Sequence, residues 1–115
     1  MALERPPPPY GARGTVFVSV GLPDALAQAF AGARQINHFH LSDITPEAMR
    51  VLGVAMVACP LMGKEADALC VIAALDLAGF AGTLTVISPR LPDAAMVERE
   101  LRAASRGVRV NLITL

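Results

Sequence analysis

The sequence predicts one α/β domain with a doubly wound, three-layer architecture. Short apolar runs alternate with segments of helical periodicity from residue 15 to residue 115, and the run over 54–59 (VAMVAC) is apolar at every position. An all-apolar strand is typical of a parallel sheet covered on both faces. We therefore expect a five-stranded parallel sheet in the order 2-1-3-4-5. We also expect the domain to lack the final helix, because the sequence stops after its fifth strand.

The first strand is expected over 15–20 (TVFVSV), a β-branched run that ends at Gly21. Asp24 follows Pro23 as the expected N-cap of a helix over 25–33, where apolar residues recur at i, i+3, i+4 and i+7. These signals predict a strand that leads directly into a helix.

The second strand is expected over 35–41 (QINHFHL). Thr45 then precedes Pro46, a residue favoured at the first position of a helix, and we expect a short helix through about Leu52. The buried strand over 54–59 follows this helix directly.

The second half repeats the alternation. A long helix is expected over 65–78, a fourth strand over 83–88, a helix over 93–105 and a fifth strand over 108–115. Gly79 marks the end of the long helix. One apolar stripe of that helix consists of Ala66, Leu69, Cys70, Ala73 and Leu77.

Composition restricts the function classes. The chain has 115 residues, and its ten Lys and Arg balance ten Asp and Glu, which argues against binding nucleic acid or a membrane through net charge. No apolar run reaches the roughly 18 residues of a spanning helix, and the start lacks a signal peptide's apolar core. The two cysteines, Cys59 and Cys70, form no disulfide pattern. We expect a cytoplasmic domain at 15–115 after a flexible proline-rich arm at 1–14.

A small ligand is expected, if at all, in the crevice outside the carboxyl ends of strands one, three and four, where the strand order reverses. Arg90 is the one cation beside the fourth strand and suits a carboxylate or phosphate group; the alternative is an exposed loop arginine. The candidate crevice residues are Gly21, Ala58, Cys59, Gly63, Ser88 and Arg90.

Three motifs that could support ligand binding or catalysis are incomplete at this edge. The stretch 58–65 (ACPLMGKE) has the outline of a phosphate-binding loop, but Pro60 removes an amide and Glu65 replaces the hydroxyl that would bind magnesium. Cys59 has no neighbouring histidine or second cysteine, and neither Ser19 nor Ser88 lies in a GxSxG turn. We expect no catalytic residue.

His38 and His40 are two apart on the second strand and are expected to share one face. Histidines at this spacing can bind one zinc or iron ion, with Asp43 as a third ligand. Polar residues are also expected on an edge strand, because they discourage its pairing with a strand of another chain. We expect neither a metal nor another cofactor.

The layout of 15–115, with a hydroxyl residue, Ser88, at the end of the fourth strand, resembles the receiver domain of two-component response regulators. The resemblance implies a phosphoacceptor aspartate at the end of the third strand, where this sequence has Ala58 and Cys59. It implies an acidic pair at the end of the first strand, where Ser19, Val20 and Gly21 stand, and a lysine near the end of the fifth, where the sequence has none. Because these acids are missing, the resemblance implies that the magnesium site is lost and that phosphotransfer should fail.

The resemblance therefore implies a pseudo-receiver that is not phosphorylated on aspartate. It also implies a fifth helix beside the first, which the sequence does not supply. A bare apolar sheet face favours association, so we expect a protein partner or a homodimer there. The expected interface residues are Val110, Leu112, Ile113 and Leu115. The alternative is that the arm, with Leu3 and Tyr10, covers the same face.

Three functions remain open at this level. The first is a non-enzymatic signalling or scaffold module that acts through protein contacts. The second is a small-ligand binding protein or small enzyme that uses the crevice. A third, prompted by 37–45 (NHFHLSDIT), is an anti-sigma-antagonist-like domain, although the layout lacks that fold's opening pair of strands.

Overall fold

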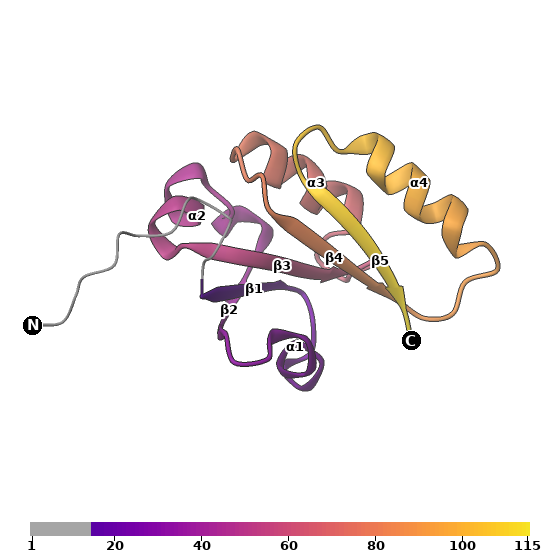
Figure 1. Ribbon diagram of the computed structural model, residues 1–115, viewed down its shortest axis with the longest axis horizontal. Coiled ribbons are helices and arrows are strands. Elements are labelled where there is room, and N and C mark those ends of the chain that lie inside the picture. Colours follow the sequence, from indigo (N-terminus) through magenta and orange to yellow (C-terminus); the bar gives the residue numbers. More distant parts are fainter. Residues whose placement is uncertain (1–14) are drawn as a thin grey trace, which may run out of the picture.

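The structure is a computed structural model that describes residues 15–115, and the expected arm at 1–14 lies outside the described residues. All five strands pair in parallel, in the predicted order β2-β1-β3-β4-β5. The strands are β1 (Val16–Val20), β2 (Gln35–Phe39), β3 (Val54–Pro60), β4 (Thr83–Ser88) and β5 (Arg109–Thr114). The helices are α1 (Asp24–Ala31), the short 3-10 helix η1 (Leu41–Asp43), α2 (Pro46–Leu52), α3 (Ala68–Leu77) and α4 (Ala94–Ala104). Figure 1 shows this arrangement, which is consistent with a flavodoxin-like α/β fold.

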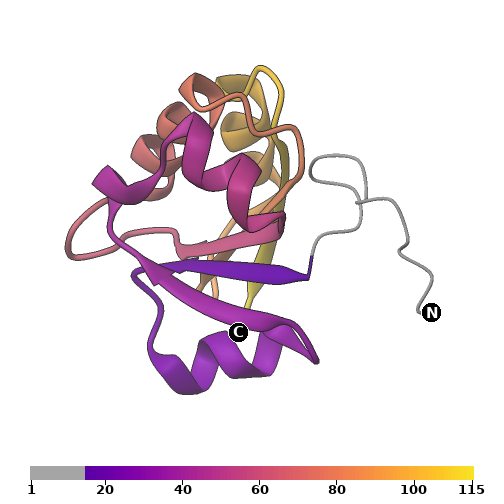
Figure 2. The same cartoon turned by 90° about the vertical axis from the view of Figure 1, so that its left-hand side faces the viewer.

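The helices divide unequally between the two faces of the sheet. Figure 2 shows α1 alone on one side, with α2, α3 and α4 together on the other. No helix follows β5 within residues 15–115. The face that carries α1 is therefore the less covered of the two.

Each face has its own apolar core. The larger core lies under α2, α3 and α4 and contains Val18, Val57 and Val86 from three neighbouring strands. The smaller core, under α1, contains Phe17 and Ala58. Successive residues of a strand point to opposite faces, so β3, which is apolar throughout, contributes to both cores. This is the physical reason that the run over 54–59 predicted a central strand correctly.

Side chains cap the starts of two helices, and the first of these caps, at Thr45, was expected. The Thr45 hydroxyl accepts a hydrogen bond from the Ala48 N–H at 3.1 Å, with Pro46 at the first helical position. The side chain of Asp93 accepts from the Met96 N–H at 3.0 Å and begins α4. Both side chains satisfy N–H groups that the first turn of a helix leaves unpaired.

Two other expected helix starts are wrong. Pro23 occupies the N-cap position of α1 without a side-chain hydrogen bond, and Asp24 is the first helical residue. The long helix begins at Ala68 instead of residue 65, because the Asp67 side chain caps it by accepting from the Cys70 N–H. The residues before Asp67 instead form an irregular loop, closed by a bridge between Met62 and Asp67.

The apolar stripe predicted for α3 faces outward. Leu69 is 52% exposed and Leu77 is 87% exposed, and Cys70 and Ala73 are exposed as well. The buried side of α3 consists of Ala68, Val71, Ile72 and Leu75. Because α3 is apolar at every position except Asp76, both of its faces are apolar and only packing decides which one is buried.

Candidate functional site

At the carboxyl edge, where the crevice was expected, Gly21 lies beside Pro60. Gly21 has a φ of 89°, a conformation that favours glycine, and turns the chain from β1 toward α1. A Cβ at this position would lie 3.6 Å from Pro60 Cδ, so the end of β3 lies directly against the turn. An added methyl group would therefore just reach van der Waals contact with the Pro60 ring, so the turn after β1 lies beside the end of β3.

Ala58 and Cys59 are both fully buried but point to opposite faces. Ala58 belongs to the core under α1, and Cys59 belongs to the core under α3. Burial, with a smaller contribution from the charge of Asp67, raises the pKa of the Cys59 thiol to about 12. Because the thiolate is the reactive form, the buried position of Cys59 disfavours a role as a nucleophile.

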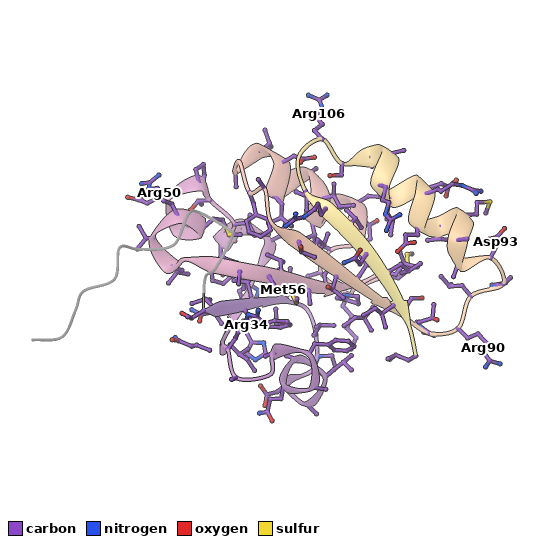
Figure 3. All side chains as sticks on the ribbon, viewed as in Figure 1. Arg34, Arg50, Met56, Arg90, Asp93 and Arg106 are labelled. Carbon is purple, nitrogen blue, oxygen red and sulfur yellow. The ribbon has the colours of Figure 1, made fainter. Side chains whose placement is uncertain are left out.

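Ser88 and Arg90 do not converge on a common point. The Ser88 hydroxyl is buried and donates to the neighbouring Pro89 carbonyl oxygen at 2.8 Å. Arg90 is exposed, and Figure 3 shows its side chain pointing away from the domain, from the loop after β4. Of the candidate crevice residues, the only charged one is thus turned to solvent.

Gly63 has a structural role in the loop after β3. A Cβ at this position would collide with the Ala66 carbonyl oxygen and lie 3.1 Å from the Pro60 ring. The loop is also fixed by hydrogen bonds from Leu61 N–H to the Ile87 carbonyl and from Ala68 N–H to the Leu61 carbonyl. This tight turn explains the glycine without a phosphate ligand.

Ser19 is the residue that sequence analysis undervalued. It is fully buried on β1, where its Cα pairs with those of His38 on β2 and Ala58 on β3. Among the side chains of residues 15–115, its Oγ is the buried polar atom without a hydrogen-bond partner. Such a group carries a desolvation cost. The serine, in an otherwise apolar strand (VFVSV), was the available signal.

The two histidines turn to different carboxylates and not to a shared site. His38 Nε2 lies 3.0 Å from Asp24 Oδ1, at the start of α1, and His40 Nδ1 lies 2.9 Å from Glu65 Oε1, in the loop before α3. The hydrogen bond to Glu65 raises the pKa of His40 above its usual value of 6.5. No group of three or more potential metal ligands occurs within the described part of the chain.

The expected interface residues fall on both faces of β5. Val110 is 3% exposed, and Leu112 packs half-buried against the same core under the helices. Ile113 is half-buried and Leu115 is 66% exposed. Alternation along the strand places these last two on the other side. Only this second pair is therefore open to a partner.

A second apolar surface lies on the outer side of α3. Leu77 borders a hollow of about 640 Å³ between the ends of α3 and α4, which is also lined by Ala73, Phe80, Ala104 and Arg106. The hollow has a fixed wall, because Asp76 accepts from the N–H groups of Arg106 and Gly107 at 3.0 Å each. Figure 3 shows the Arg106 side chain projecting from this end of the molecule.

Comparisons with protein-family models, with curated proteins and with solved structures find no match. Within residues 15–115, the helices are also too short or too polar to cross a membrane.

Proposed function

We propose that this chain is a cytoplasmic, non-enzymatic module of the pseudo-receiver type that acts through protein–protein contacts. The observation that carries the proposal is the exposed apolar ridge of α3, formed by Leu69, Ala73 and Leu77. Both Cys59 and Cys70 are free thiols, which suits a reducing compartment. The resemblance to receiver domains supports a signalling or scaffold role.

The ridge has the geometry of a helix-packing surface. Its three residues are spaced at i, i+4 and i+8, and rows of this spacing pack into the grooves of another helix. A fully buried leucine side chain contributes about 1.5–3 kcal/mol. Leu69 and Leu77 are exposed in this chain. Burying them against a partner would therefore contribute favourable free energy to binding.

We infer that the partner presents an amphipathic helix with an acidic residue beside its apolar stripe. The apolar stripe would lie along α3, with one side chain in the hollow beside Leu77. Arg106 stands at the rim of the hollow and is exposed, so it is placed to pair with a carboxylate. Rim charges of this kind mainly set partner choice and association rate.

Site-specific photo-crosslinking tests this surface directly. A photoreactive amino acid replaces Leu77 in one variant and Ala25 in the control, because Ala25 is exposed on α1 at the opposite face. We expect an adduct from position 77, mapped by mass spectrometry to an apolar helix, and none from position 25. Leu77→Lys should abolish the contact and leave the melting temperature unchanged, since Leu77 is 87% exposed. Equal labelling at positions 77 and 25 contradicts the proposal. So does an adduct from position 77 that persists when Leu69→Lys and Arg106→Glu are added.

Small-ligand binding at the carboxyl edge is the second candidate, favoured by the unpartnered hydroxyl of Ser19. A thermal-shift screen with small carboxylates and phosphate esters tests it. A shift that disappears in both Ser19→Ala and Arg90→Ala supports the crevice. A shift that survives both changes, or no shift with any compound, speaks against it.

A further inference from the structure

Two side chains of α4 cover the outer edge of β5, the strand at one end of the sheet. Arg102 Nε donates to the Val110 carbonyl oxygen at 2.9 Å. Glu98 Oε2 accepts from the Leu112 N–H at 2.8 Å. The two side chains also form an ion pair, with 3.5 Å between Arg102 Nη2 and Glu98 Oε2. We call them the edge pair.

The pairing of β5 with β4 shows which backbone groups point outward. The N–H groups of Arg109 and Leu115 donate to carbonyl oxygens in and just before β4. Backbone groups of successive residues alternate in direction along a strand. The groups that face away from β4 therefore belong to Val110, Leu112 and Thr114.

The edge pair copies one residue of a neighbouring strand. In a parallel ladder, a residue opposite Asn111 would donate its N–H to the Val110 carbonyl and accept from the Leu112 N–H. Arg102 supplies this donor and Glu98 supplies this acceptor. The two side chains thus fill the place of one residue of a sixth parallel strand.

We propose that the outer edge of β5 is a strand-pairing surface for a second copy of this chain, and that the edge pair keeps it closed. This surface is distinct from the α3 ridge. In an antiparallel pair centred on Leu112, the outward groups of Val110 meet those of the partner's Thr114, and Leu112 meets the partner's Leu112. Every outward N–H and carbonyl of β5 then has a partner, so the strand is complementary to itself across a two-fold axis.

Both side chains of the edge pair reach solvent, and their hydrogen bonds to β5 are partly buried. Arg102 is 55% exposed and Glu98 is 28% exposed. Exposed ion pairs contribute little to stability, and uncovered edge strands are templates for pairing with another chain. The state of two surface side chains thus decides whether the sheet ends at β5 or continues into a second copy.

The test compares the double variant Glu98→Ala/Arg102→Ala with Arg99→Ala/Glu100→Ala in the full chain. The control removes one acid and one base from the same helix, at two positions that are both exposed. We expect sedimentation and light scattering to show a doubling of the mass of the first variant relative to the wild type as concentration rises. The control should follow the wild type throughout.

A third substitution separates strand pairing from other association. Thr114→Pro removes one outward N–H and leaves the bonds to β4 intact, so adding it should return the double variant to the mass of the wild type. If the double variant does not fold, Arg102→Ala alone takes its place in the experiment. It should also associate, and adding Thr114→Pro should again return the mass to that of the wild type. A mass equal to that of the wild type, equal association of the control, or association that persists with Thr114→Pro overturns the proposal.

Discussion

His40 and Glu65 lie 25 positions apart in the chain, and a hydrogen bond of 2.9 Å joins His40 Nδ1 to Glu65 Oε1. It connects the end of β2 to the loop before α3. The hydrogen bond and the negative charge of Glu65 both favour the protonated imidazole, so the pKa of His40 lies above 6.5.

The first prediction concerns this pKa. In Glu65→Gln the pKa of His40 should fall, and an NMR titration of the imidazole C–H resonances measures the change. Glu47→Gln is the matched control, because Glu47 is an exposed carboxylate on α2. A raised folded-state pKa stabilises the protein below the unfolded value, and this contribution is lost as the pH rises through the folded value. A His40 pKa that is identical in Glu65→Gln and the wild type contradicts the contact.

The second prediction concerns Ser19, whose buried Oγ has no hydrogen-bond partner. Ser19→Ala should raise the free energy of unfolding by about 1 kcal/mol, because it removes an unsatisfied buried hydroxyl. Urea denaturation measures the change, with Thr114→Ala as a control because Thr114 is exposed at the end of β5. A loss of stability instead would show that the hydroxyl has a hydrogen-bond partner in the folded protein, which would remove the observation that favours the crevice as a ligand site.

The third prediction separates the two cysteines. Cys70 is exposed and Cys59 is buried, and burial raises the pKa of Cys59 to about 12. A thiol reagent should modify one cysteine in the folded protein and both in denaturant. Cys70→Ser should abolish the reaction in the folded state, whereas Cys59→Ser should leave it unchanged. Rapid labelling of Cys59 in the folded protein would contradict its position in the core.

Local chemistry explains which parts of the fold were predictable. The all-apolar strand over 54–59 indicated the parallel sheet because β3 contributes to both cores. Thr45 and Asp93 were predictable as helix starts because each caps an N–H three residues later. Asp24 was not predictable in the same way. Its carboxylate accepts a hydrogen bond from the Gln28 side chain and contacts His38, which lies on β2 and not on α1.

Contacts between distant residues explain what the sequence could not predict. Periodicity identified the stripe of Leu69, Ala73 and Leu77, but a helix that is apolar on every side gives no sign of which face is buried. The edge pair depends on how Glu98 and Arg102 align with β5. Their i, i+4 spacing predicts only an ion pair on one helix.

The last prediction concerns Gly63, which was expected in a ligand crevice and instead permits a tight turn. Its added Cβ would collide with the Ala66 carbonyl oxygen, a backbone atom that cannot move without shifting the loop. Gly63→Ala should therefore lower the free energy of unfolding by about 1–3 kcal/mol, the usual cost of overpacking.

Gly107→Ala is the matched control, because the nearest atom to its added Cβ, Asp76 Oδ1, lies 4.0 Å away. Urea denaturation of both variants beside the wild type measures the difference. Because Ala68 N–H donates to the Leu61 carbonyl across the same loop, faster amide exchange at Ala68 should accompany the loss of stability in Gly63→Ala alone. If Gly63→Ala matches Gly107→Ala in both measurements, the turn does not require glycine and Gly63 becomes available again as a ligand-site residue.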